Sequence, residues 1–325
     1  MINEWLTADW WLNPQIDYLV WLQNIRLSTG GAFDNLFLHI TAFGELAIPT
    51  IVICIIYWCI DFEAGFYLFT VQGLGLYIAK ILKMVGCIYR PWILSDKIKP
   101  VESALKMSGG YSFPSGHTAM ATTTWGGLAV LLRKRKLLAS LLVFFAILIG
   151  FSRNYVGVHT PQDVLTSLIC CFAFVIGGFY LIKWCDQDKK RYAYFLAIFN
   201  IICLISLYYI LTKEYRIDYF NGKRIANPQH AIYSSIMSFG WIMGMINGAV
   251  ACKNLTPYNP KNGTLKARIN IGIIGTIILI LLFKTVGEFF FAGTHNYYLT
   301  YIAMFTVAAY LTFGFPVIIR KFYNN

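Results

Sequence analysis

Residues 137–183 read LLASLLVFFAILIGFSRNYVGVHTPQDVLTSLICCFAFVIGGFYLIK. Two apolar runs, 137–152 and 160–183, flank a short polar stretch in this segment. A helix that crosses a bilayer needs about 20 mostly apolar residues. The second run meets this length, and we expect the helix of the first run to continue toward residue 158. The segment therefore predicts two consecutive transmembrane helices whose polar connection lies at one membrane surface.

The composition of the whole chain predicts the same environment. Of its 325 residues, 58% are apolar and 13% are charged, whereas soluble domains are roughly 45–50% apolar and about 25% charged. Aromatic residues make up 17% of the chain, and tryptophan and tyrosine collect at membrane–water interfaces. These values exclude a soluble enzyme and a disordered chain, and they predict a polytopic membrane protein.

The apolar runs together predict an all-α fold, a polytopic transmembrane helix bundle. We expect nine spans, at 35–60, 64–86, 116–132, 137–152, 160–183, 193–212, 231–251, 268–291 and 297–319. The first six would form a core at 35–212, and the last three a C-terminal membrane extension at 213–325. We expect residues 1–34 to lie on the membrane surface, with an amphipathic helix over 14–28 that has Pro14 in its first turn.

Charge and cysteine content limit the partners. The chain carries 27 Lys and Arg against 15 Asp and Glu, a net charge of +12. This excess favours contact with anionic lipids or an anionic substrate, and we expect no nucleic-acid partner because no basic stripe with interleaved aromatic residues is present. None of the eight cysteines forms a C-x-x-C pair, and most lie in apolar runs. We therefore predict no metal site, no disulfide framework and no cofactor.

The orientation follows from a short basic connection, 133–136, which reads RKRK. Short loops rich in Lys and Arg stay in the cytoplasm. We therefore place this loop inside and the polar connection 90–115 outside. Two sequons, at Asn254 and Asn262, test this topology, because it keeps their loop in the cytoplasm, where N-glycans are not added.

Three polar clusters interrupt the apolar background, each near the end of a span. They are KMVGCIYRP at 83–91, PSGH at 114–117 and SRNYVGVHTPQD at 152–163. Because consecutive helices alternate in direction, all three clusters fall on the same membrane face. We expect them to converge in space.

The cationic and small residues of these clusters predict a phosphate site. Arg90 and Arg153 offer forked donors that match phosphate oxygens, and Lys83 adds a third cation. Ser115 and Gly116 begin a helix, where backbone N–H groups and the helix dipole favour an anion.

Two histidines beside this predicted phosphate site indicate the reaction that it would catalyse. Asp163 follows His159 by four residues, and Pro161 lies between them at a first-turn position. A carboxylate at this spacing can hold one imidazole N–H and leave the other nitrogen free. We expect His159 to attack phosphorus and form a phospho-histidine without a metal. His117 would protonate the leaving oxygen and then activate water.

The three clusters match the pattern K-x6-RP, PSGH and SR-x5-H-x3-D at every position. The chain therefore resembles the integral membrane branch of the type-2 phosphatidic acid phosphatase superfamily, which also contains bacterial prenyl-diphosphate phosphatases, glucose-6-phosphatases and vanadium haloperoxidases. The resemblance implies a six-span phosphatase core at 35–212, with His159 as nucleophile, Asp163 as its orienting carboxylate and His117 as general acid. It also implies a set of phosphate ligands, namely Lys83, Arg90, Ser115, Gly116 and Arg153.

A site at the membrane interface favours a lipid phosphate, whose tail stays in the bilayer. We rank phosphatidate-like lipids and undecaprenyl diphosphate or monophosphate first, and the motifs do not separate a monoester from a diphosphate. The connection 92–113 is expected to shape the entrance and the specificity. Recycling of such a lipid fits a bacterial plasma membrane with the active site on the extracytoplasmic side.

Three alternatives remain from the sequence. A sugar-phosphate phosphatase resembling glucose-6-phosphatase would share the motifs and the nine spans, but it would need a water-filled cavity. A vanadate-dependent haloperoxidase is disfavoured by the hydrophobic chain. A lipid transporter or scramblase without catalysis is disfavoured by the complete set of His117, His159 and Asp163. The oligomeric state is not predicted.

A few polar residues lie outside the motifs. Lys284 and Glu288 are four apart and share a face of the eighth span; a structural ion pair is the simpler interpretation, and reception of a substrate head group is the functional one. We interpret Cys87 as a packing residue. We interpret three histidines as interfacial, namely His39, His230 and His295.

Overall fold

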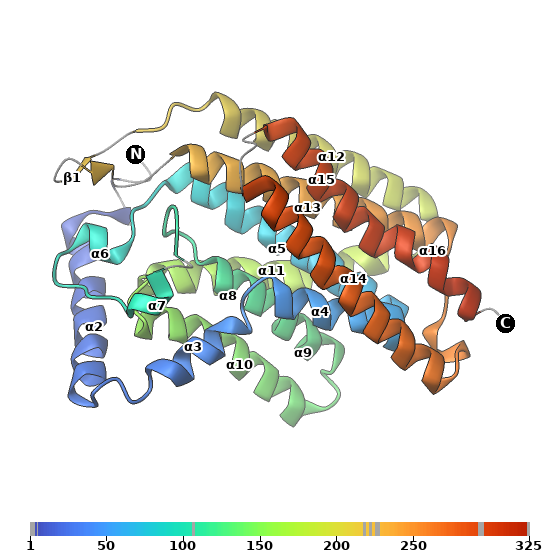
Figure 1. Cartoon of the computed structure of the whole chain (residues 1–325), viewed down its shortest axis with the longest axis horizontal. Helices are drawn as coiled ribbons and strands as arrows, with labels where there is room; N and C mark the ends of the chain where they lie inside the picture. Colours follow the sequence, from blue (N-terminus) through green and yellow to red (C-terminus); the bar gives the residue numbers. More distant parts are fainter. Residues whose placement is uncertain are drawn as a thin grey trace. The chain divides into compact units, whose positions relative to one another are not determined.

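The computed structural model describes residue 4 and residues 6–105, 108–216, 219–220, 223–224, 228–291 and 296–323. Its elements are helices joined by short connections, apart from one hairpin of two-residue strands, β1 (Tyr219–Phe220) and β2 (Lys223–Arg224) (Figure 1). The prediction of an all-α, polytopic fold is confirmed.

The chain forms two compact units. The first comprises Met1–Leu46, Ile78–Ala173 and Thr212–Ile232, and the second comprises the remaining segments, Ala47–Tyr77, Phe174–Leu211 and Tyr233–Asn325. The predicted division at residues 34 and 212 follows different boundaries and stays a prediction.

Within the described residues, seven helices are long and apolar enough to cross a membrane, and an interrupted pair would make an eighth. The chain is thus an integral membrane protein. The seven are Phe62–Leu94, which holds α5 (Phe62–Gly86), α10 (Lys136–Tyr155), α11 (Pro161–Cys185), α12 (Lys189–Thr212), α13 (Pro228–Leu255), the Leu265–Thr285 part of α14 (Leu265–Phe291), and Tyr297–Phe322, which begins with α15 (Tyr297–Ala309). The helix that we expected to continue toward residue 158 ends at Tyr155.

The third expected span, 116–132, is helical but short, so nine full spans are not found in the described chain. It consists of α8 (Gly116–Ala121), the π-helical turn η2 (Thr122–Gly126) and α9 (Gly127–Leu131), with 6, 5 and 5 residues. At 1.5 Å per residue it reaches about 24 Å, less than the hydrocarbon thickness of about 30 Å. Its three central threonines are fully buried, and Thr122 Oγ1 donates to the Thr118 carbonyl at 2.7 Å.

The first expected span, 35–60, is interrupted. Helix α3 (Asp34–Ala42) ends before residue 43, and α4 (Ala47–Ile55) begins after residue 46 and continues into η1 (Ile56–Ile60). At Gly44 a Cβ atom would lie 2.7 Å from the His117 carbonyl oxygen. A residue with a side chain would clash there, so the break can pack against the backbone of α8 only because residue 44 is glycine.

The N-terminal helix is longer than expected. Helix α2 (Asp9–Ser28) begins at Asp9, where the Ala8 carbonyl accepts from two following N–H groups, and Pro14 lies inside it instead of in its first turn. Its apolar face does not face outward, because Leu12, Ile16 and Leu19 pack against Ile98 and the segment that holds α6 (Pro91–Leu94), which lies beside α2 in Figure 1.

The second unit contains a close contact between α13 and α15. Gly240, Gly244 and Gly248 recur every four residues of α13. A Cβ atom at Gly244 would lie 2.2 Å from the Phe305 carbonyl oxygen, and one at Gly240 would lie 2.5 Å from that of Tyr301. Small residues at this spacing let two membrane helices pack backbone to backbone, which explains how the C-terminal helices hold together.

Candidate active site

All eight predicted site residues lie in the first compact unit. Lys83 is in the last turn of α5, Arg90 precedes α6, and Arg153 is in the last turn of α10. Ser115 caps α8, and Asp163 is in the first turn of α11. Two helix ends and three helix starts therefore supply the cluster.

The imidazole of His159 is held by the carboxylate of Asp163. Nδ1 lies 3.2 Å from Asp163 Oδ2. The same oxygen accepts from Ser112 Oγ at 2.6 Å and from the Thr160 N–H at 2.9 Å. Because the first turn of a helix has free N–H groups, α11 itself helps to orient the carboxylate. This arrangement places the His159 proton on Nδ1 and leaves the lone pair on Nε2.

Arg90 contacts this unprotonated nitrogen. Its Nη1 lies 2.9 Å from His159 Nε2 and donates to the Val158 carbonyl at 3.0 Å. Nη2 and Nε donate to the carbonyls of Gly109 and Gly110 at 3.1 and 3.3 Å. The guanidinium is therefore fixed at the nitrogen that we expect to attack phosphorus, where it can bind the oxygens of a phosphate group.

Burial and neighbouring cations keep the His159 ring neutral. The residue is 2% exposed, and this burial lowers its pKa well below the ordinary value. The positive charges of Arg90, Arg153 and Lys83, and His117, lower the pKa further. A neutral imidazole that carries its proton on Nδ1 and none on Nε2 is the nucleophilic form, once Arg90 donates to the phosphate instead of to Nε2.

Lys83 contacts the loop that leads into α8. Its Nζ donates to the carbonyls of Tyr111, Ser112 and Pro114 at 2.9, 2.9 and 2.8 Å. An ammonium group has three donors, so this loop satisfies all of them. In this structure Lys83 therefore positions the backbone before Ser115, which the motif alone does not indicate.

Ser115 joins α8 to α11. Its Oγ accepts from Thr118 Oγ1 at 2.8 Å and caps the Thr118 N–H at 3.4 Å. Its N–H donates to the Asp163 carbonyl at 3.0 Å, and Ser167 Oγ donates to its carbonyl at 2.8 Å. Gly116 is exposed, and a Cβ atom there would meet no other atom within 4 Å. The start of α8 is thus anchored to α11 through Ser115 and is exposed at Gly116.

Arg153 is 1% exposed and has neutral partners. Its Nη1 donates to Thr41 Oγ1 at 2.9 Å, and its Nη2 donates to Ser108 Oγ at 3.2 Å. Its Nε has no hydrogen-bond partner among the residues that the structure describes. A buried guanidinium with an unused donor is suited to an anion brought by a ligand.

His117 is next to Gly116 and is 16% exposed. Its Nε2 lies 3.9 Å from Glu45 Oε1, too far for a hydrogen bond, and it has no such partner in the described part of the chain. The site thus contains two imidazoles, one held by a carboxylate and one facing a carboxylate across a gap.

Sequence reasoning missed the supporting residues. Ser112 lies before the second motif, and its only signal was its position in the polar connection 90–115. Ser108 lies in the same connection, whereas Thr41 and Glu45 lie in the first expected span, where the apolar pattern conceals them.

The structure describes some of the polar residues outside the motifs and not others. His39 is exposed, and its Nδ1 lies 2.6 Å from the Asn35 carbonyl oxygen. Cys87 Sγ donates to the Met84 carbonyl at 3.2 Å. Lys284 lies on an exposed turn of α14, but the side chain of Glu288 and all of His295 lie outside the described residues, so both hypotheses about Lys284 and Glu288 stay predictions.

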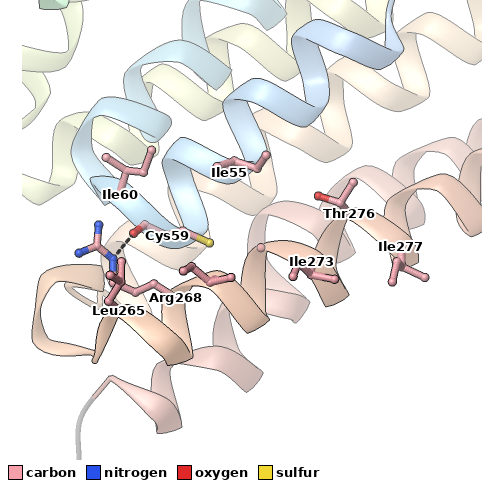
Figure 2. A pocket seen from close by; sticks show the side chains of 10 residues that line it. Ile55, Cys59, Ile60, Leu265, Arg268, Ile273, Thr276 and Ile277 are labelled. Carbon is pink, nitrogen blue, oxygen red and sulfur yellow. Dashed lines mark hydrogen bonds between the residues drawn. The ribbon is translucent and has the colours of Figure 1, made fainter.

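A groove of about 510 Å³ lies in the second unit (Figure 2). Its lining is mainly aliphatic and comes from α4, η1 and α14, with Ile55, Ile269 and Ile273 among the residues. Arg268, which donates to the Cys59 carbonyl, is its charged residue. The groove offers no pair of acid and base residues and contains none of the motif residues, so it is not a candidate for phosphate hydrolysis.

Part of the chain is similar to known proteins. Residues 64–191 match the model of the PAP2 superfamily. Phosphatidylglycerophosphatase B of Bacillus subtilis is 29% identical over 118 residues, 34% of this chain and 55% of the relative. Undecaprenyl-diphosphatase BcrC of the same organism is 36% identical over 112 residues, 34% of this chain and 53% of the relative.

A third relative is the undecaprenyl-diphosphatase of Sulfolobus acidocaldarius, 32% identical over 94 residues, 29% of this chain and 43% of the relative. The chain spans about half the length of the curated relatives it matches. No solved structure matches it. The segment that is similar to the PAP2 superfamily, 64–191, contains all eight predicted site residues.

Proposed function

We propose that the chain is an integral membrane phosphatase that hydrolyses a lipid phosphate monoester or diphosphate through a phospho-histidine. The observation that carries this proposal is the geometry of His159. Its Nδ1 faces Asp163 at 3.2 Å, and its Nε2 faces Arg90 at 2.9 Å. The ring is thus oriented by a carboxylate on one side and aimed at a phosphate-binding group on the other.

In the first step, Nε2 of His159 attacks the phosphorus atom, and the bond from phosphorus to the leaving oxygen breaks. His117 gives its proton to that oxygen, so the product leaves as an alcohol or, from a diphosphate, as a lipid monophosphate. The Nδ1 proton remains on His159, where the negative charge of Asp163 stabilises the phosphorylated ring.

In the second step, neutral His117 takes a proton from a water molecule, and the water oxygen attacks phosphorus. The P–N bond breaks, inorganic phosphate leaves, and both histidines return to their starting states. No metal ion takes part in either step, so we expect full activity in EDTA.

The charge on the equatorial oxygens is stabilised by Arg90 and Arg153. Ser115 and Gly116 add donors at the start of α8. We assign Lys83 to the same ligand set, although its three present contacts are carbonyls of the preceding loop. Its charge would act on the phosphate through that loop or directly.

The names of the three relatives support the substrate class. They describe a phosphatidylglycerophosphate and undecaprenyl diphosphate, two phosphates carried by a lipid tail. We propose a substrate of this kind that stays in the bilayer, in a plasma membrane with the site on the extracytoplasmic side.

The test is phosphate release by the purified protein in detergent with EDTA. Phosphatidate, phosphatidylglycerophosphate, undecaprenyl diphosphate and glucose 6-phosphate would be compared, with His159→Ala as the inactive variant and His39→Ala as its matched control. We expect release from lipid substrates, lost only in His159→Ala. Preference for glucose 6-phosphate would replace the lipid with a soluble substrate, and release that persists in His159→Ala would overturn the proposal.

A further inference from the structure

A glutamate outside all three motifs faces His117. Glu45 lies in the break between α3 and α4, and its Oε1 is 3.9 Å from His117 Nε2. The two side chains are 29% and 16% exposed. His117 Nε2 is itself buried and lacks a hydrogen-bond partner within the described residues. The carboxylate therefore faces a polar atom that still needs a partner.

The backbone on either side of Glu45 is anchored to the site. Trp125 Nε1 donates to the Phe43 carbonyl at 3.1 Å. Gly44 approaches the His117 backbone so closely that a Cβ atom would lie 2.7 Å from its carbonyl oxygen. Gly44 N–H and Glu45 N–H donate to the carbonyls of residues 41 and 42, which closes the turn. The position of Glu45 beside His117 is thus set by the fold of the break.

Protonated His117 needs a nearby carboxylate because the other charged groups around it are positive. Burial, then the positive charges of Arg153 and Arg90, lowers the pKa of His117 to about 4, and Glu45 opposes this shift. His159 is the neighbouring imidazole. Two cations disfavour a third positive charge nearby, whereas a carboxylate favours it. A general acid has to be protonated when the substrate binds. The arginines that would bind phosphate therefore disfavour the protonated form of His117 beside them.

We propose that Glu45 is a positioning residue that favours the protonated form of His117 and aims its imidazole for the role of general acid. This inference rests on the proposed function, because it assigns Glu45 to the protonation of the leaving oxygen. Glu45 does not touch the substrate and does not react. It offsets the positive charge of Arg90 and Arg153, and its carboxylate attracts the imidazole of His117 across 3.9 Å.

The experiment compares two substrates in Glu45→Gln, which keeps the size of the side chain and removes its charge. A lipid phosphate has an alkoxide leaving group that needs a proton, whereas 4-nitrophenyl phosphate has a leaving group that departs without one. We expect kcat to fall about 10-fold or more with the lipid phosphate and less than about twofold with the aryl phosphate. The alkaline limb of the pH profile for the lipid should move to lower pH.

Three further variants make the result decisive. Glu45→Asp should recover part of the lost rate, because it restores the charge. Glu214→Gln, at an exposed glutamate of the same unit, should match the wild type. Equal losses with both substrates and an unmoved alkaline limb would show a structural role and overturn the inference, while an inactive His159→Ala would leave the proposed function standing. Release retained in His159→Ala would instead overturn the proposed function.

Discussion

Arg153 in the first compact unit and Lys253 in the second are both cations near the end of a long helix. Lys253 pairs with Glu63 and lies 2.9 Å from Asp186 Oδ1, so two carboxylates neutralise it. Arg153 is almost fully buried and donates to the neutral hydroxyls of Thr41 and Ser108. A buried charge with neutral partners is poorly compensated.

The difference indicates where a ligand would contribute. In the second unit, Lys253 is neutralised by acids of the same unit, and we interpret this contact as stabilising the fold. The first unit keeps Arg153 with an unused Nε donor, next to Arg90 and His159. An incoming phosphate would supply the missing negative charge. Four changes would test this contrast, the first with the greatest predicted loss and the last with the least.

Arg153→Lys keeps the charge and removes the forked donors. We expect kcat with the lipid substrate to fall about 100–1000-fold, because a preorganised donor to the transition state is lost. Phosphate release and thermal unfolding would be measured together. Arg133→Lys, at an exposed arginine, is the matched control. If both variants kept full activity, Arg153 would be a structural cation like Lys253.

Ser112→Ala removes the hydroxyl that donates to Asp163 Oδ2 at 2.6 Å. We expect about a 10-fold loss in kcat with little change in KM, because Asp163 and the His159 ring would be less well oriented. Steady-state kinetics with the lipid phosphate provide the measurement. A change confined to KM would assign Ser112 to substrate binding instead.

Lys253→Met breaks the ion pairs of the second unit. Both carboxylates are well exposed, so we expect the free energy of unfolding to fall by only about 1 kcal/mol. Activity at 25 °C should stay within about twofold of the wild type. Lys261→Met, at the more exposed pair with Asp61, should change neither quantity. A large loss of activity in Lys253→Met would remove the distinction between the two units.

The acid limb of the pH profile should lie below the ordinary pKa of histidine. Burial, then the charges of Arg90, Arg153 and Lys83, lowers the pKa of His159, so the neutral nucleophile persists below the ordinary histidine value. Activity should fall only as the pH drops through that lowered pKa. Unfolded His159 binds a proton at higher pH than the folded residue, so folding stability falls as the pH drops from the ordinary histidine pKa toward the lowered one. An acid limb at the ordinary histidine pKa in kcat/KM would contradict this.

The sequence predicted those parts of the site that depend on local spacing. His159 lies two residues before α11 and Asp163 lies in its first turn, so their contact is local in the sequence. The convergence of the three motifs followed from the alternation of spans. Ser112, Thr41 and Glu45 reach the site through long-range packing, which the apolar pattern of one chain does not encode.

The fold was predicted in class but not in detail. Composition identifies an apolar run, but it does not reveal that the run 116–132 is too short for a full crossing or that the run 35–60 is interrupted at Gly44. The start of α2 at Asp9 depends on the Ala8 carbonyl and on packing against Ile98. Both lie beyond the periodicity that suggested a start at Pro14.

The most direct test of the central claim is a quench experiment with a lipid substrate labelled with ³²P in the transferred phosphate. The account predicts label on the protein that is lost in acid and stable in alkali, as expected for a phospho-histidine. The label should be present in the wild type and in His39→Ala and absent in His159→Ala. Label of the opposite stability, or turnover that continues in His159→Ala, would contradict His159 as the nucleophile.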